Sequence, residues 1–197
     1  ALHFHQILFE RATALSQPVR IVWMHEGIPD LSDPEIQVLT DLVADNRFVS
    51  LLIHVPGTGR SEARGFETSF QKEVMSRRIK AGNTFGGVNV RVETAAGAPL
   101  EFVNSGLSRS LVYGTDAAEL NRIHSNLPAA AKSDILVVHA DQTVSGDPLK
   151  EATSLLAAIV EIFSPNPMPQ TVVHAGDLLS AHLDLMQQVR ELFSQSA

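Results

Sequence analysis

The sequence predicts a three-layer α/β domain with a mostly parallel sheet, of the Rossmann-like or flavodoxin-like class. Apolar, β-branched runs of strand length recur at 19–25, 48–54, 134–139 and 171–174, and segments with helical periodicity separate them. Continuous apolar strands that alternate with helices are typical of parallel sheets covered on both faces. With 44% hydrophobic residues, the chain can bury a substantial core, and we expect one domain over 1–197.

Apolar residues at helical spacing predict the helices that precede and follow these strands. Ser32, three residues before Glu35, forms a capping box ahead of one of them, and Asp116 is placed to cap another. The predicted helices cover about 2–15, 34–45, 66–79, 116–127, 148–163 and 177–194.

A period-two pattern interrupts this alternation in the middle of the chain. Val88, Val90 and Val92 alternate with polar residues, and LEFV at 100–103 follows a short turn. This pattern predicts a β-hairpin that is exposed on one face and inserted in the sheet or added at its edge.

The composition excludes several classes of function. The net charge of −7 and the pI of about 5.6 leave no basic stripe for a phosphate backbone, so nucleic-acid binding is disfavoured. No apolar run approaches the roughly 18–20 residues that span a bilayer. The absence of cysteine excludes disulfides and thiolate sites; we expect a cytoplasmic protein, with export as the alternative. Because the chain begins at Ala1, we expect an excised domain or a processed product.

Each of the four predicted buried strands ends at a histidine, namely His25, His54, His139 and His174. In open α/β sheets, ligands bind outside the carboxyl ends of the strands. The sequence therefore predicts that these rings lie along one edge of the sheet. Acidic residues follow closely at Glu26, Asp30, Asp141 and Asp177.

Imidazoles with carboxylates are ligands of zinc, manganese and iron, so a divalent metal and metal-dependent hydrolysis form one hypothesis. The strand-end histidines have no HxH or HExxH spacing that would support it. For any single histidine, the commoner interpretation is a ring that packs on the core edge and bonds a neighbouring loop carbonyl.

Residues 54–61, HVPGTGRS, form a second candidate feature at the same edge. A strand followed by glycines and a helix start lets backbone N–H groups and a positive helix end hold a phosphate. The segment resembles the phosphate-binding loop of AAA-type nucleotide hydrolases, GxxxxGK[ST]. The resemblance implies a magnesium-ligand role for Ser61 and a second metal carboxylate at Asp141.

The segment departs from that loop at two diagnostic positions, since His54 replaces the first glycine and Arg60 replaces the lysine. A histidine side chain crowds the tight first turn, and arginine is bulkier and more rigid than lysine. A degenerate anion-binding loop and a surface turn of turn-favouring residues are the alternatives. The densest basic region, Arg60, Arg64, Arg77, Arg78 and Lys80, is interpreted as a solvated helix face or as the rim of an anion site.

Together these features predict a small-molecule site at the carboxyl edge that binds or hydrolyses a phosphorylated or otherwise anionic ligand. The predicted catalytic residues are His54, Arg60, His139 and Asp141. The predicted ligand-binding residues are His25, Gly57, Thr58, Gly59, Ser61, His174 and Asp177. In hydrolysis, a histidine would act as general base or metal ligand, and Arg60 with the loop amides would stabilise negative charge. The alternative is a non-catalytic scaffold or regulatory domain that binds a protein partner, or a second copy, through the apolar C-terminal helix.

Overall fold

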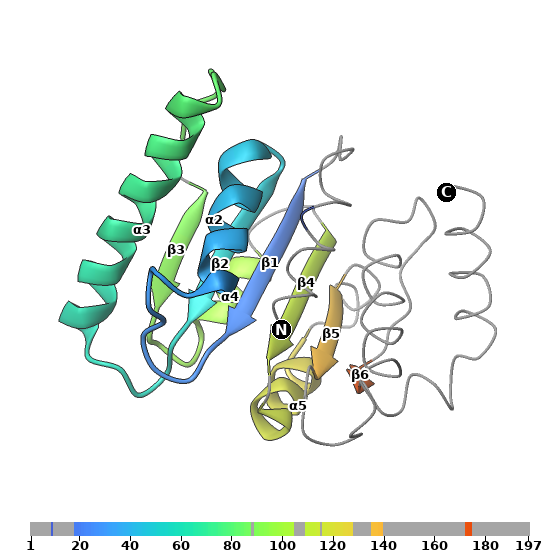
Figure 1. Cartoon of the computed structure of the whole chain (residues 1–197). Coiled ribbons are helices and arrows are strands. Elements are labelled where there is room, and N and C mark those ends of the chain that lie inside the picture. The colour runs from blue at the N-terminus through green and yellow to red at the C-terminus, as the bar shows by residue number, and fades with distance from the viewer. Residues whose placement is uncertain are drawn as a thin grey trace.

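The computed structural model describes residues 9, 18–87, 89–104, 109–114, 116–127, 135–139 and 172–174. Its six strands are all parallel and lie in the order β3-β2-β1-β4-β5-β6 (Figure 1). The strands are β1 (Val19–Met24), β2 (Val49–His54), β3 (Val90–Glu93), β4 (Arg109–Gly114), β5 (Ile135–His139) and β6 (Val172–His174). This strand order is that of Rossmann folds, so the predicted fold class is confirmed.

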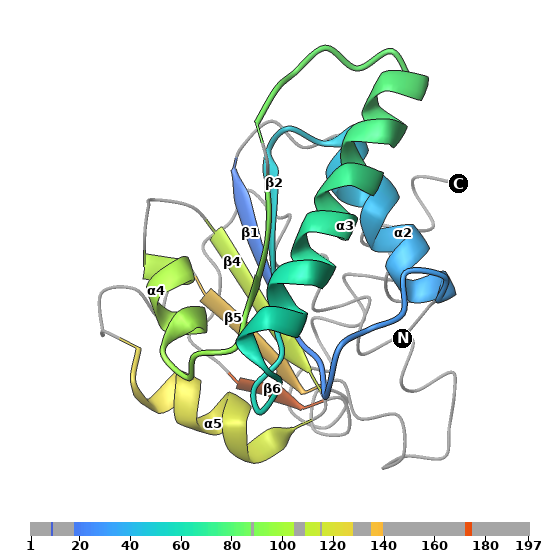
Figure 2. The ribbon, with the colours of Figure 1, turned by 90° about the vertical axis from the view of Figure 1, so that its left-hand side faces the viewer.

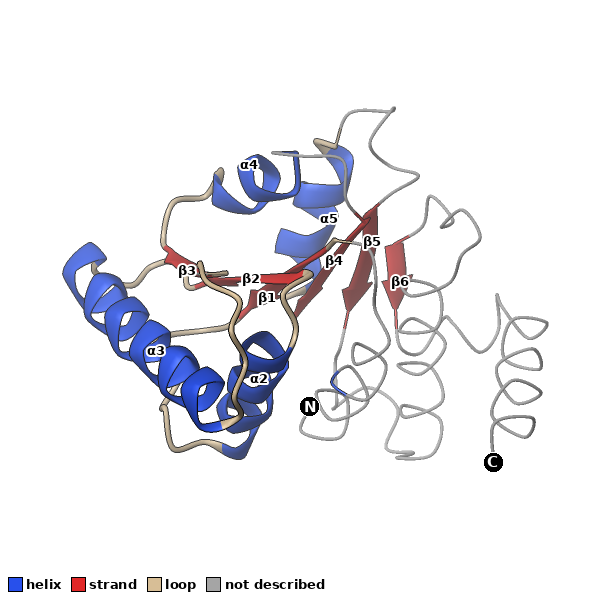
Figure 3. Cartoon of the chain, turned by 90° about the horizontal axis from the view of Figure 1, so that it is seen from above, coloured by secondary structure: helices blue, strands red, loops and turns tan. Residues whose placement is uncertain are grey.

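Helices cover both faces of the sheet (Figures 2 and 3). The described helices are α2 (Pro34–Asp45), α3 (Arg60–Lys80), α4 (Ala98–Asn104) and α5 (Ala117–Ser125). Side chains alternate between the two faces of a strand. In β1, Ile21 and Trp23 pack with α2 and α3, whereas Val22 and Met24 pack with α4 and α5. The strand is apolar throughout because both of its faces are buried.

Two predicted helices are confirmed, and a third is longer than expected. The helix predicted at 34–45 is α2, and the helix capped by Asp116 is α5, where the Asp116 carboxylate accepts from Glu119 N at 3.1 Å. Helix α3 begins at Arg60, earlier than predicted. Ala63 is the one buried residue before Phe66, so apolar spacing did not reveal these first turns. The helices predicted at 2–15, 148–163 and 177–194 lie outside the described residues.

The predicted capping box at Ser32 is wrong. Asp33 occupies the N-cap position of α2, and its side chain makes no capping hydrogen bond. Ser32 N and Oγ instead donate to Asp30 Oδ1 at 2.9 and 2.8 Å, and these bonds lower the pKa of Asp30. Ser32 therefore stabilises the connection before the helix and not the helix end.

The predicted β-hairpin is also wrong. Strand β3 pairs in parallel with β2, and the LEFV segment lies in α4, which has Pro99 in its first turn. The period-two pattern arises because β3 lies at the edge of the described sheet, where Val90 and Val92 are buried and Arg91 is exposed. The following segment, SRSLVYG, contains the central strand β4.

Two side chains of α3 cover the outer edge of β3. Val92 N donates to Glu67 Oε2 at 2.8 Å, and Gln71 Nε2 donates to Val90 O at 3.1 Å. Unpaired edge groups are a template for pairing with another chain, and side-chain partners block that pairing. Helix α3 therefore protects the edge as well as covering the face.

Replacement of this edge cover should have a measurable cost. Glu67→Ala removes the acceptor of Val92 N, so we expect the free energy of unfolding to fall by about 1–2 kcal/mol, with increased self-association. Urea unfolding and sedimentation velocity measure the two effects. Glu62→Ala, an exposed first-turn glutamate of the same helix, is the control and should cost below about 0.5 kcal/mol. Equal losses in both variants would contradict the role of Glu67 at the edge.

Candidate functional site

The order of the strands creates a crevice between β1 and β4. The chain runs outward through β2 and β3, then returns to β4 on the other side of β1, so the connections after β1 and β4 diverge. In open α/β sheets, ligands bind at this reversal point. A cavity of about 230 Å³ lies there, lined by Met24, His25, Glu26, Pro56, Asp116 and Glu119. Figure 2 shows this end of the sheet at the bottom, where α5 meets the connections that leave β1 and β2.

Gly114 allows β1 and β4 to approach closely beside this cavity. Gly114 is the register partner of Met24, and a Cβ added to it would lie 2.8 Å from Met24 Cβ and 3.0 Å from Met24 O. Only glycine fits between these atoms without a backbone shift. The width of the crevice at its base therefore depends on this one position.

His25 has a defined orientation in the cavity wall. Its Nδ1 lies 2.8 Å from Gly27 O, and its ring contacts Trp23 edge to face at a centroid distance of 4.7 Å. Because a carbonyl can only accept, we assign the proton of the neutral ring to Nδ1 and a lone pair to Nε2. The φ of 75° at Gly27 turns its carbonyl back toward the ring. His25 thus offers the crevice a hydrogen-bond acceptor.

Three carboxylates complete this wall. Glu26 and Asp116 are exposed, and Glu119 is half-buried. Arg122 donates to Glu119 from Nε at 2.9 Å and from NH2 at 2.5 Å, and this bonding lowers the pKa of Glu119. With Glu119 ionised and with Nε2 of the assigned His25 tautomer as an acceptor, the wall presents mostly acceptors, which favours ligand groups that donate hydrogen bonds.

His54 lies beneath the surface and does not line the cavity. Its side chain is fully buried, and Nε2 donates to Ala95 O at 3.0 Å. Nδ1 has no hydrogen-bond partner, and burial lowers the pKa of the ring, so His54 is neutral in the folded chain. This is the commoner interpretation of a strand-end histidine, a ring that packs at the core edge and bonds a loop carbonyl.

The strand register separates the four histidines into two pairs. His139 and His174 are register partners on β5 and β6, and His54 pairs with Met24, the residue before His25. Strands β1 and β4 lie between His54 and His139. Three strand spacings of about 4.8 Å put these two backbones about 14 Å apart. The four strand ends therefore do not form a single compact site.

The carboxylates expected beside the second pair, Asp141 and Asp177, lie outside the described residues. In the part of the chain that the structure describes, no group of three or more His, Asp or Glu residues is arranged to hold a metal ion. The metal hypothesis thus depends on residues beyond this part.

The loop that resembles a nucleotide-binding segment forms a tight turn. Thr58 N donates to Val55 O at 3.4 Å, with Pro56 and Gly57 between them and a φ of 78° at Gly57. Proline followed by a positive-φ glycine is the signature of a type II turn. Turn geometry thus accounts for Gly57. Pro56 lines the cavity, whereas the predicted site residues Arg60 and Ser61 are exposed at the start of α3 and are not among the lining residues.

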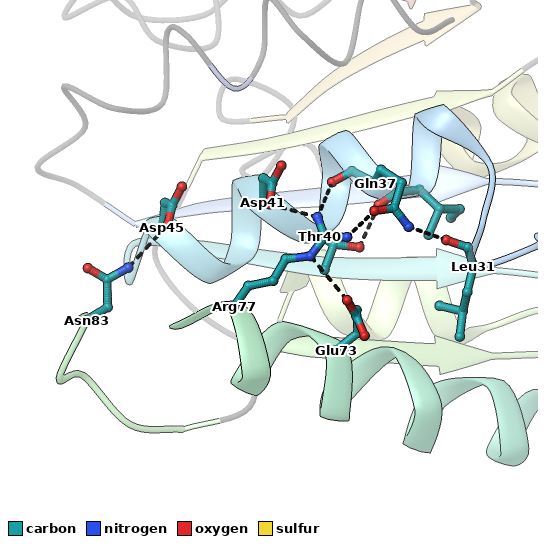
Figure 4. Close-up of polar contacts among 9 residues, drawn as sticks. Leu31, Gln37, Thr40, Asp41, Asp45, Glu73, Arg77 and Asn83 are labelled. Atoms are coloured by element: carbon teal, nitrogen blue, oxygen red, sulfur yellow. Dashed lines mark hydrogen bonds and ion pairs between the residues drawn. The ribbon is translucent and has the colours of Figure 1, made fainter. Parts of the chain in front are cut away.

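A polar network fixes the other connection that borders the crevice (Figure 4). Gln37 Nε2 of α2 donates to Leu31 O in the β1–α2 connection. Arg77 of α3 donates from NH1 to Gln37 O at 2.9 Å and to Asp41 Oδ1 at 2.7 Å. The connection that carries His25 and Glu26 is thereby anchored to two helices, which favours a preformed site.

Comparisons with protein-family models, curated proteins and solved structures find no match for this chain. Among the helices that the structure describes, none combines the length and the apolar character needed to cross a bilayer. The functional argument therefore rests on the geometry of the crevice.

Proposed function

We propose that this protein binds a small polar molecule in the crevice between the carboxyl ends of β1 and β4. The observation that carries the proposal is the coincidence of the cavity with the reversal of the strand order. This position selects the ligand site in open α/β folds because the diverging connections leave a gap that side chains line.

The charges of the wall support a ligand with hydroxyl or ammonium groups. Glu26, Asp116 and His25 Nε2 offer acceptors, and such groups donate to all three. The phosphate or other anionic group expected from the sequence would lie toward Arg60 and the amides at the start of α3. The proposed ligand class is therefore a small hydroxyl- or amine-bearing compound, with any phosphate directed to that turn.

The connection after β1 opposes a dinucleotide ligand. The dinucleotide fingerprint requires three glycines there and a helix start free for the pyrophosphate. This connection contains Gly27 alone, and Asp33 and Glu35 occupy the start of α2. Two carboxylates at that helix start repel a pyrophosphate, so we propose a smaller ligand.

A panel that varies the amine and the phosphate independently tests this ligand class. Glucose, glucosamine, glucose 6-phosphate and glucosamine 6-phosphate form such a set, with inorganic phosphate as the fifth probe. We expect a rise in Tm with the amine-bearing sugars and a larger rise with glucosamine 6-phosphate. A ligand at 100 times its Kd adds about 2.7 kcal/mol of stability. A response to inorganic phosphate alone, or to none of the five, would contradict the proposed class.

Charge-neutral variants of the wall locate the site. Glu26→Gln combined with Asp116→Asn should weaken binding of the active probe at least about tenfold, because each charge-assisted hydrogen bond contributes about 1.5–3 kcal/mol. Asparagine retains the cap of α5, so stability should hardly change. Titration calorimetry measures the affinity. Glu101→Gln, an exposed carboxylate on α4, is the matched control. Unchanged affinity in the double variant would place the ligand elsewhere.

Two further hypotheses from the sequence fall on other parts of the chain. Docking of a protein partner through the C-terminal helix involves residues outside the described part. The same holds for a hydrolytic metal site that includes Asp141 and Asp177. Both stay predictions.

A further inference from the structure

The turn between β3 and α4 is held by two side chains at consecutive carbonyls. His54 Nε2 donates to Ala95 O at 3.0 Å, and Arg122 NH2 donates to Ala96 O at 3.2 Å. His54 belongs to β2 and Arg122 to α5, so the turn is fastened to the sheet on one side and to a helix on the other. Ala95 O also accepts from Ala98 N at 3.1 Å, which begins α4.

Glu119 connects this turn to the crevice. It binds Arg122 through both carboxylate oxygens, and it lines the cavity. The same carboxylate therefore orients the arginine that holds Ala96 and forms part of the proposed ligand site.

The imidazole of His54 has one nitrogen without a partner. Ala95 fixes the proton of the neutral ring on Nε2, which leaves Nδ1 as a lone pair in a fully buried side chain. A neutral acceptor in this position is tolerated at modest cost. A proton on Nδ1 would create a buried donor and a buried charge, both of which require an acceptor.

Charged groups on the neighbouring elements determine which acceptor a protonated Nδ1 would bond. The charges of Glu119 and Arg122 on α5 and of Glu93 on β3 affect the pKa of His54. Glu93 pairs with Arg91 at 2.9 Å and lies 4.0 Å from Arg64. The neighbour on β1, Met24, is uncharged, and the α4 carboxylate, Glu101, is exposed. Glu119 lines the cavity together with Met24, the register partner of His54, and it has Arg122 as its cationic partner.

We propose that His54, Glu119 and Arg122 form a proton-sensitive clamp on the β3–α4 turn. With His54 neutral, Glu119 holds Arg122 and Arg122 holds the turn. A proton taken up at Nδ1 gives the ring a second donor, and the Glu119 carboxylate moves from Arg122 to that donor. Arg122 then no longer donates to Ala96 O, and the β3–α4 turn loses one of its two side-chain hydrogen bonds. The movement of Glu119 also alters the wall of the crevice. The effect on ligand binding rests on the proposed function, whereas the clamp does not.

The direction of the pH dependence follows from burial, which lowers the pKa of His54 from the ordinary 6.5. The unfolded chain therefore takes up this proton at a higher pH than the folded chain. The stabilisation by neutral His54 is complete above pH 6.5 and is lost as the pH falls from there toward the lowered pKa. The clamp should open over that interval.

Hydrogen exchange of the Ala98 amide reports on the clamp, because its acceptor is the carbonyl that His54 holds. We expect its protection, corrected for the intrinsic effect of pH, to decrease by up to about tenfold per pH unit between pH 6.5 and the lowered pKa of His54, and to level off below that pKa. NMR of the His54 imidazole should place the midpoint of its titration where this decrease levels off. In His54→Gln, whose amide keeps the donor and cannot titrate, protection should be independent of pH.

His25→Gln removes the neighbouring titratable ring of the crevice and should keep the transition. A transition that persists in His54→Gln, or His54 titration without loss of protection, would overturn the proposal. If His54→Gln does not fold, Glu119→Gln provides the test. It removes the negative charge that favours the protonated ring, so the midpoint should move to lower pH, and an unmoved midpoint overturns the clamp.

Glucosamine binding, measured at pH values above and below the transition, separates the two proposals. If glucosamine binds but the protection of the Ala98 amide does not depend on pH, the clamp is contradicted and the proposed function is not. If the protection depends on pH but glucosamine does not bind, the proposed function is contradicted and the clamp is not.

Discussion

Arg78→Met is expected to lower the free energy of unfolding by about 3–4 kcal/mol, because it removes three hydrogen bonds that a buried guanidinium donates. Arg78 is 1% exposed and has no acidic partner among its hydrogen bonds. It donates to Gly87 O at 2.5 Å, to Val43 O at 3.1 Å and to Asn89 Oδ1 at 2.5 Å. Val43 belongs to α2, and Gly87 and Asn89 lie directly before β3, so Arg78 connects α3 to α2 and to the segment that leads into β3.

Two opposing effects determine the size of this loss. Burial disfavours the guanidinium, which lowers the pKa of Arg78, so its removal recovers part of the desolvation cost. Against this, the substitution loses three hydrogen bonds from a charged donor, each of which contributes about 1.5–3 kcal/mol, although Val43 O keeps Asn89 Nδ2 as a donor at 3.2 Å. The second effect is larger. Urea unfolding should show a lower midpoint, and Lys80→Met, an exposed cation in the same helix turn, should change it little.

Gly114→Ala is expected to cost about 2–4 kcal/mol through overpacking between β1 and β4. The new Cβ would meet Met24 Cβ at 2.8 Å and Met24 O at 3.0 Å, and the carbonyl belongs to a strand in the centre of the sheet. A side chain could rotate away, but this backbone cannot move without breaking its pairing. We also expect weaker ligand binding, because the shift occurs beside the crevice.

Gly65→Ala is the matched control, with an effect of opposite sign. Gly65 lies within α3, and a Cβ added there meets nothing within 4 Å. Alanine in a helix interior is more stable than glycine by about 0.5–1 kcal/mol. Thermal or urea unfolding of both variants should therefore give changes of opposite sign. Destabilisation by both would show that the cost at Gly114 is not specific to the contact with Met24.

The order and type of most elements could be predicted from local pattern. Apolar runs gave β1, β2, β5 and β6 nearly at their observed bounds. The prediction failed where the same sequence pattern is compatible with two different structures. The alternation at 88–92 comes from an edge strand and not from a hairpin. No strand was predicted at β4, where Arg109 and Ser110 leave only Leu111, Val112 and Tyr113 as an apolar run. Partners on neighbouring strands decide such cases, and they are distant in the sequence.

The charge pattern of α3 was informative only in part. Arg64 pairs with Glu67 at 2.9 Å, and Arg77 pairs with Asp41 at 2.7 Å. Arg78 is buried at the amino ends of the strands, opposite the crevice. The interpretation of this basic region as one anion-binding rim is therefore wrong for Arg77 and Arg78. Sequence spacing places them on a helix but does not reveal what packs against it.

The sequence alone determined that this chain forms a parallel α/β sheet and that polar residues gather at the carboxyl edge, because periodicity and strand ends are local properties. Only the tertiary structure decided which of those residues meet. The strand order puts Glu26 and His25 of one connection beside Asp116 and Glu119 of another, although about 90 residues separate them in the chain. It also buries His54 under Ala95 and separates it from His139. Strand order depends on long-range packing, which no local pattern encodes.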